Sequence, residues 1–173
     1  MRVVAGSAGG HRLQSPPGAS TRPTADRVRE ATFNALNSLG LVNGATVLDL
    51  FAGSGALGIE ALSRGAERAT FVDNDPKAIA AVQANLAATH LDDRAKVIRG
   101  DAVRQLPTLG GVDLALIDPP YSFDDASWTS LLDVLDARVA VIESNRDVPV
   151  PDSWRVLRSK KYGGTVVIIT ERA

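Results

Sequence analysis

From Thr46 onward, short apolar runs of strand length alternate with segments in which apolar residues recur at helical spacing. Strands that alternate with helices are joined by right-handed crossovers, and such crossovers build a parallel sheet with helices on both faces. Five runs predict buried strands, at 46–51, 69–73, 95–99, 112–118 and 138–144. Two segments predict helices, at 55–65 and 76–90. This alternation predicts a doubly wound α/β fold.

Two more predicted strands follow, at about 154–160 and 164–170, and little more than the sequence KYGG separates them. So short a connection joins antiparallel neighbours. The complete prediction is a Rossmann-like, mostly parallel sheet of seven strands that ends in an antiparallel C-terminal hairpin.

The residues ahead of Thr46 predict a smaller arrangement. Residues 1–14 suggest a small β-hairpin around GSAGG, and SPPGAS suggests a loop. The segment TADRVREATFNALNSLG predicts a helix with Thr24 as N-cap and Gly40 as its stop. Its predicted apolar stripe contains Val28, Ala31, Ala35 and Leu39. We therefore predict a basic hairpin and loop extension at 1–21 and a main domain at 22–173.

The composition excludes several kinds of site. The chain has no cysteine, which excludes disulfides and thiolate chemistry, and with only His11 and His90 as imidazoles we expect no metal site. No apolar leader follows Met1, and no apolar run approaches membrane-spanning length. We therefore expect a cytoplasmic protein with no membrane association and no obligate protein partner.

Positive charge collects at the two ends of the chain. Residues 1–30 contain five arginines and only two acidic residues, and residues 155–173 contain five basic residues and one acidic residue. The middle of the chain is correspondingly acidic, since the formal net charge is −1. Basic ends around an acidic centre favour a polyanionic partner at the ends and a neutral or cationic ligand at the centre.

A glycine-rich turn follows the first predicted strand, in the sequence LDLFAGSGALG. Such a turn lets the backbone approach a ligand, and the helix that follows offers unpaired N–H groups. Gly53, Gly55 and Gly58 also spell the dinucleotide fingerprint G-x-G-x-x-G, with Asp73 twenty residues beyond Gly53. A nicotinamide-dependent oxidoreductase is therefore one alternative.

Acidic residues near successive strand ends favour a different cofactor. Asp49 can face an ammonium group, Asp73 can accept from both hydroxyls of a ribose, and Asp101 can accept from an adenine amine. These groups all occur in S-adenosylmethionine, which has no phosphate. Helix capping is the alternative role for Asp101 and the favoured one for Asp75.

The sequence DPPY, residues 118–121, ends the fourth predicted strand. Each proline fixes its own φ and pushes the residue before it into extended geometry, so the backbone is stiff there. An exocyclic amine on a nucleobase is a poor nucleophile. If Asp118 and the Pro119 carbonyl each accept one of its N–H bonds, its lone pair can point at a sulfonium methyl, while Tyr121 stacks on the base.

With these motifs together, the sequence resembles the amino-methyltransferases of nucleic-acid bases and specifically the RsmD family of bacterial 16S rRNA guanine-N2 methyltransferases. The resemblance extends over nearly the whole chain and is carried by MRVVAG, RPTADRVREATFNAL, DLFAGSGALGIEALSRGA, FVDND, DPPY and the late YGG. It implies a class I methyltransferase fold, S-adenosyl-L-methionine as cofactor and 16S rRNA as partner, either alone or within a small-subunit assembly particle.

The resemblance also implies roles for individual residues. The predicted cofactor site consists of Asp49, Phe51, Gly53, Gly55, Asp73, Asn74, Asp101 and Ala102. Within it, Asp49 and the two glycines would line the methionine part, Asp73 the ribose, and Asp101 and Ala102 the adenine. The predicted catalytic residues are Asp118, Pro119, Pro120 and Tyr121. From the basic N-terminal hairpin and the RPTADRVRE segment, we expect RNA contacts at Arg2, Arg12, Arg22 and Arg27.

Three alternatives remain at this point. An adenine-N6 methyltransferase acting on DNA or RNA would also use DPPY, although DNA enzymes of that kind usually need a recognition region larger than these short strand connections can hold. An oxidoreductase would have no use for DPPY. A non-catalytic RNA-binding module would not need an intact cofactor pocket.

Overall fold

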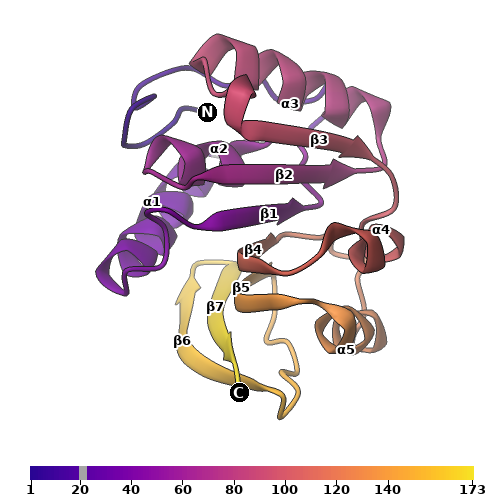
Figure 1. The fold of residues 1–173 in the computed structure, drawn as a ribbon. Helices are drawn as coiled ribbons and strands as arrows, with labels where there is room; N and C mark the ends of the chain where they lie inside the picture. Colours follow the sequence, from indigo (N-terminus) through magenta and orange to yellow (C-terminus); the bar gives the residue numbers. More distant parts are fainter. Residues whose placement is uncertain (20–22) are drawn as a thin grey trace.

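The computed structural model describes residues 1–19 and 23–173, which form a seven-stranded sheet with helices on both faces (Figure 1). In spatial order the strands are β3-β2-β1-β4-β5-β7-β6. Their bounds are β1 Thr46–Leu50, β2 Arg68–Asp73, β3 Ala95–Arg99, β4 Val112–Ile117, β5 Ala137–Ser144, β6 Trp154–Tyr162 and β7 Thr165–Arg172. The predicted strands are confirmed to within about two residues at each end.

Strand β1 lies in the middle of the parallel part of the sheet, between β2 and β4. β5 continues the parallel order beside β4, whereas β7 is antiparallel to both β5 and β6. The predicted mixed sheet with an antiparallel C-terminal hairpin is confirmed. Because β1 to β5 are parallel, the loops after β1, β2, β3 and β4 all leave from the same edge, which we call the carboxyl edge.

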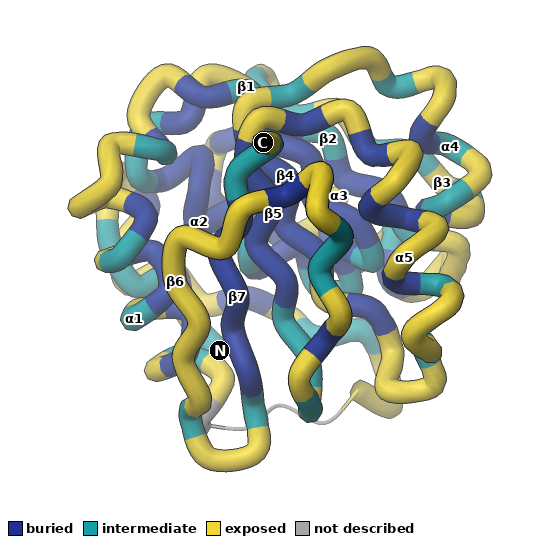
Figure 2. The backbone as a smooth tube through the Cα atoms, turned by 90° about the horizontal axis from the view of Figure 1, so that it is seen from below, coloured by how far each residue is buried: buried dark blue, intermediate teal, exposed yellow. Residues whose placement is uncertain are grey.

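Two apolar layers hold the sheet between its helices. One contains Phe33, Leu36, Ile59 and Phe71, together with residues of the N-terminal segment, and the other contains Trp128. The helices are α1 Pro23–Ser38, α2 Ala56–Ser63, α3 Pro76–Thr89, α4 Ala102–Leu109 and α5 Asp125–Val134, with a 3-10 turn η1 at Asp92–Arg94. Figure 2 shows the central strands buried and the edge strand β6 exposed. No helix within the described ranges is long and apolar enough to cross a membrane.

Helix α1 differs from its prediction. It begins at Pro23, so Thr24 is inside the helix rather than its N-cap, although Gly40 does follow its end with a φ of 69°. The predicted stripe was also wrong at Leu39, which is 48% exposed, because the buried face instead includes Arg29, Thr32, Phe33 and Leu36. A buried arginine on this face is possible because Glu60 of α2 lies opposite its guanidinium.

The N-terminal segment is less regular than a hairpin but is closely packed. Its antiparallel pairing is the single bridge between Arg2 and Arg12. Val3, Ala8 and Leu13 are buried against the same core as α1 and α2. Removing this segment would therefore open the core, so the role of its charges must be tested by substitution rather than by truncation.

Candidate active site

The first functional element is the glycine-rich turn between β1 and α2. Asp49 is 1% exposed, and its Oδ2 accepts a hydrogen bond from the Gly58 N–H at 2.9 Å. A Cβ on Gly58 would lie 2.3 Å from the Phe71 ring, so this helix can approach the sheet only with glycine there. The carboxylate thus fixes the first turn of α2 against β1.

The turn itself has an unusual backbone. Phe51 has a φ of 59°, which is uncommon for a residue with a bulky side chain, and Gly53 and Gly55 have φ values of 58° and 79°. A Cβ on Gly55 would lie only 3.2 Å from Val82 of α3. The Gly53 N–H donates to Asp73 Oδ2 at 2.9 Å, which ties this turn to the end of β2.

The predicted ribose and adenine residues follow β2 and β3. Asp73 Oδ1 accepts from the Asp75 N–H at 2.9 Å, so both of its carboxylate oxygens already hold backbone donors while each keeps a second lone pair. Asn74 is exposed beside it. Asp101 caps α4 by accepting from the Arg104 N–H at 2.9 Å, and Ala102, the first residue of that helix, is buried. The capping alternative for Asp101 is therefore realised, and one carboxylate oxygen remains for a ligand.

The residues of DPPY lie beside the glycine-rich turn, because β4 is the neighbour of β1. Asp118 is exposed, Pro119 is buried, Pro120 is exposed and Tyr121 is 66% exposed. A large aromatic ring left open to solvent at this edge is available for stacking. The arrangement brings an acid, a stiff backbone and an exposed ring together at one end of one strand.

Phe123, which the sequence analysis did not single out, fixes the loop that carries DPPY. Its ring packs edge-on against Phe51 at 5.3 Å and against Trp128 of α5 at 5.2 Å between ring centres. The Phe123 carbonyl also accepts from Arg146 at 3.2 Å. The turn after β1 and the loop after β4 are thus joined through two aromatic rings.

The carboxyl edge is strongly acidic. Burial is the main cause that raises the pKa of Asp49 well above its ordinary value, and the charges of Asp118 and Asp73 raise it further. The protein atoms crowded around the Asp118 carboxyl raise its pKa to about 6, even though the residue is exposed. Carboxylates that disfavour each other's ionisation favour a bound cation.

Glu143, at the end of β5, is a further acid of this edge that the sequence analysis missed. Burial and then the charge of Asp118 raise its pKa to about 8, against the opposing effect of Arg29. The only sequence signal was its position near the end of the run RVAVIES, at the carboxyl end of a strand.

We expect Glu143→Gln to stabilise the protein by on the order of 1–3 kcal/mol near pH 8. An acid whose pKa is raised by folding does not destabilise the folded state below its unfolded pKa, which is near 4.5. Its destabilising effect on the folded state grows as the pH rises from there to about 8. Equilibrium unfolding in denaturant at pH 4.5 and pH 8.5 measures the difference. A stability difference that does not grow with pH would show that Glu143 ionises without cost.

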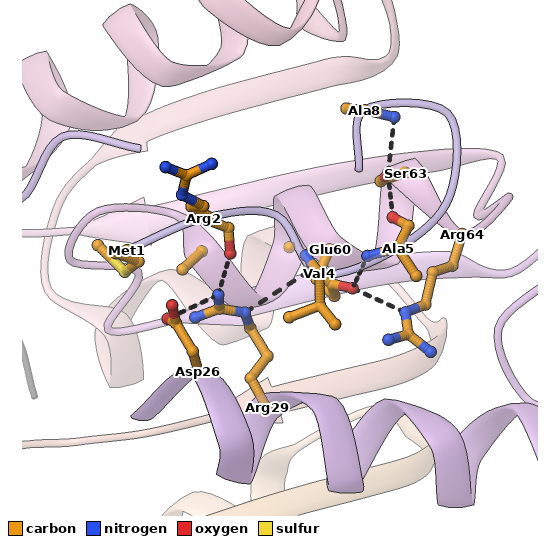
Figure 3. A network of polar contacts seen from close by, with 12 residues as sticks. Met1, Arg2, Val4, Ala5, Ala8, Asp26, Arg29, Glu60, Ser63 and Arg64 are labelled. Carbon is orange, nitrogen blue, oxygen red and sulfur yellow. Dashed lines mark hydrogen bonds and ion pairs between the residues drawn. The ribbon is translucent and has the colours of Figure 1, made fainter. Parts of the chain in front are cut away.

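The N-terminal segment is fastened to α2 by buried polar groups (Figure 3). Glu60, which has no exposed surface, accepts from the backbone N–H groups of Val4 at 2.8 Å and Ala5 at 3.1 Å. It also pairs with Arg64 at 2.7 Å and lies 3.6 Å from Arg29 Nε. The Arg29 guanidinium in turn donates to the Arg2 carbonyl. This network holds the Arg2 backbone in place without using its side-chain charge.

The same segment contacts the glycine-rich turn. Asn85 of α3 is 1% exposed; its side chain accepts from the Gln14 N–H at 2.7 Å and donates to the Gln14 and Ser54 carbonyls, both at 2.8 Å. Met1 Sδ lies 3.7 Å from Ser54 Oγ. Both ends of the N-terminal segment therefore adjoin the turn between Gly53 and Gly55.

The four arginines predicted to contact RNA have different surroundings. Arg2 and Arg12 are exposed and face each other across the bridge. Like charges directly opposite each other in an antiparallel pair are destabilising, so the pair has a cost that an anionic ligand would relieve. Arg27 is exposed on α1, and Arg22 lies outside the described residues.

Comparisons with known proteins agree with this geometry. The model of the family "Conserved hypothetical protein 95" matches residues 1–171. The chain is 40% identical to "Putative rRNA methyltransferase YlbH" of Bacillus subtilis, over 99% of each chain. It is 32% identical to "Ribosomal RNA small subunit methyltransferase D" of Escherichia coli, over 99% of this chain and 90% of that one. The solved structure of "Putative methyltransferase yhhF from Escherichia coli" superposes with a TM-score of 0.85 at 33% identity, covering 99% of this chain and 97% of that one.

The fold and the similarity over the whole chain place the protein in the class of Rossmann-like methyltransferases. Within that class, the chain belongs to the RsmD family.

Proposed function

We propose that this protein transfers a methyl group from S-adenosyl-L-methionine to the exocyclic N2 amine of a guanine in 16S rRNA, in the cytoplasm, with the rRNA either alone or within a small-subunit assembly particle. The observation that carries the proposal is the placement of Asp118, the stiff Pro119 carbonyl and the exposed Tyr121 ring directly beside an acidic, glycine-rich cofactor turn. The names of the family's rRNA methyltransferases support the substrate class.

The cofactor residues divide by chemistry. Asp49, with Gly53 and Gly55, would hold the cationic methionine end, because a buried carboxylate next to other acids gains most from a positive ligand. Asp73 and Asn74 would bind the ribose, and Asp101 with the first turn of α4 the adenine. Phe51 would form one apolar wall of this pocket, next to the Phe123 ring.

The target amine needs positioning more than proton removal. S-adenosylmethionine supplies an electrophilic methyl carbon on a sulfonium. Asp118 and the Pro119 carbonyl would each accept one N–H of the guanine amine, so that its lone pair points at that carbon, while Tyr121 stacks on the base and Pro120 keeps the backbone stiff. In such a transfer the C–S bond would break as the C–N bond forms, and the cationic amine would then lose a proton to water.

Transfer of a labelled methyl group to different nucleic acids tests this proposal. We expect incorporation into 16S rRNA from cells that lack the enzyme. We expect none into duplex DNA, because the single helices and short loops at the carboxyl edge are too small to form a region that recognises a duplex. Parallel titrations should give binding of S-adenosylmethionine and none of NAD. Binding of NAD, or methylation of DNA in place of rRNA, would contradict the proposal and favour the oxidoreductase or the DNA methyltransferase.

Replacing both Arg2 and Arg12 with glutamate should weaken rRNA binding and flatten its salt dependence, because fewer counterions are released when the RNA binds. The logarithmic salt slope should fall by about two or more. Cofactor affinity should change little, since both residues are exposed and the contact of Arg2 with Arg29 uses the Arg2 backbone carbonyl. Exposed Lys96 on β3, changed to glutamate, is the control. An unaltered salt slope in the Arg2/Arg12 variant would remove this segment from the RNA surface.

A further inference from the structure

A pocket of about 310 Å³ lies between α1 and the turn that joins β6 to β7. It is lined by Arg27, Val28, Ala31, Tyr162, Gly163, Gly164 and Thr165. Its size is at the lower end of the range of roughly 300–1,000 Å³ that is typical of small-ligand pockets. The turn corresponds to the late YGG sequence, to which the proposed reaction gives no role.

Strand register places this pocket at the carboxyl edge. The first residues of β7 pair with the last residues of β5, since Val166 lies opposite Ser144, and β5 pairs with β4, whose end leads into Asp118. The turn is therefore two strand spacings, about 10 Å, from the strand that carries DPPY. A nucleotide next to the target guanine in an extended strand can bridge that distance.

The lining combines an aromatic ring with positive charge. Tyr162 is half-buried, and Lys160 Nζ lies 5.2 Å from its ring centre. Arg27, which lines the pocket, is exposed, as is Lys160, and within the described ranges no carboxylate forms an ion pair with either side chain. An apolar floor with a ring, bordered by cations, matches a base and its phosphate.

The turn geometry keeps this pocket open. Gly163 has a φ of 58°, as the first central residue of a type II′ hairpin turn does, and neither Gly163 nor Gly164 has another atom within 4 Å of its Cβ position. A tight turn of two glycines thus adds no side chain to this rim of the pocket.

We propose that this pocket binds an unpaired nucleotide that flanks the target guanine, with its base on Tyr162 and its phosphate near Arg27 and Lys160. The inference rests on the proposed rRNA substrate and adds a second contact that selects the strand around the guanine. A single-stranded RNA is the expected occupant because its bases can be splayed out and stacked, whereas those of a duplex cannot.

Tyr162→Leu tests the proposal, because leucine keeps apolar packing but loses the stacking face. We expect about a tenfold or greater rise in the 16S rRNA concentration needed for half-maximal single-turnover rate. Tyr162→Phe should restore the wild-type value, and S-adenosylmethionine affinity should be unchanged in both. Leu157→Ala, which removes an exposed apolar side chain of β6 outside the pocket, is the matched control.

An RNA fragment with abasic sites beside the methylated nucleotide completes the test. With the wild-type enzyme, removing the flanking base should raise the RNA concentration needed for half-maximal rate as much as Tyr162→Leu does. With the Tyr162→Leu enzyme, removing that base should raise this concentration no further. Equal losses from the abasic site in both proteins, or a wild-type response in Tyr162→Leu, would overturn the pocket assignment and leave the methyltransferase proposal intact. A wild-type protein that does not methylate rRNA would overturn both.

Discussion

Asp118→Ala should lower the single-turnover rate of rRNA methylation by about a hundredfold or more, while the protein stays folded and binds S-adenosylmethionine within a few-fold of wild type. The reason is that a carboxylate that accepts from the guanine amine matters most as positive charge develops on the nitrogen. Rapid mixing of saturating enzyme and cofactor with rRNA measures the rate of this step. A folded Asp118→Ala protein with the wild-type rate would leave DPPY as a stiff end of β4 and nothing more.

In the same assay, Asp118→Asn distinguishes the effect of the hydrogen-bond acceptor at residue 118 from the effect of its negative charge. Its amide oxygen can still accept, so its rate should lie between those of wild type and Asp118→Ala. The sequence alone predicts no general-base inflection between about pH 6 and pH 8 from this residue, because a carboxylate cannot deprotonate an aromatic amine near neutrality. The structure revises that expectation. Since the pKa of Asp118 is raised to about 6, the wild-type rate should fall as the pH drops through that value. The rate of Asp118→Asn should not show this fall, because asparagine does not titrate there.

Asp73→Ala is the second substitution with a large expected effect. It should weaken S-adenosylmethionine binding by about 1.5–3 kcal/mol, the scale of hydrogen bonds to a charged group. The structure adds a cause that is independent of the ribose, because Asp73 also holds the Gly53 and Asp75 N–H groups at 2.9 Å. Calorimetric titration measures the loss.

Asp73→Asn and Asp75→Ala distinguish those two causes. Asparagine retains one acceptor oxygen and should lose less affinity than alanine. Asp75 accepts from the Lys77 N–H at the start of α3, so Asp75→Ala should loosen the helix cap while leaving the cofactor site intact. If Asp73→Ala binds the cofactor as tightly as wild type, Asp73 belongs to the loop structure and not to the site.

The fold could be predicted because it depends on periodicity that is local in sequence. Apolar runs and helical repeats identified every strand, and KYGG identified the hairpin. Helices α4 and α5 were not predicted, and α4 contains Pro107, a residue that normally interrupts a helix. Asp124 does cap α5 by accepting from the Ser127 N–H, which is the local signal that was available.

The layout of the candidate site could be predicted where a short motif sets the position of its residues. It could not be predicted where the layout depends on contacts between residues that are distant in sequence. Asp49 lies within the strand that the sequence predicts as buried at 46–51, and its hydrogen-bond donor, the Gly58 N–H, is only nine residues away. By contrast, no local pattern indicates that Arg29 is buried opposite Glu60, or that Asn85 binds Gln14 across 71 residues. Glu143 joins the acidic edge only because β5 lies next to β4.

The identity of the methylated nucleoside is the most direct test of the proposed reaction. Small-subunit rRNA from cells lacking the enzyme would be incubated with the wild-type protein or Asp118→Ala and isotope-labelled S-adenosylmethionine. It would then be digested to nucleosides and analysed by mass spectrometry. We predict label in N2-methylguanosine with wild type and a far slower appearance with Asp118→Ala. Label in N6-methyladenosine, or in no nucleoside of the rRNA, would contradict the account.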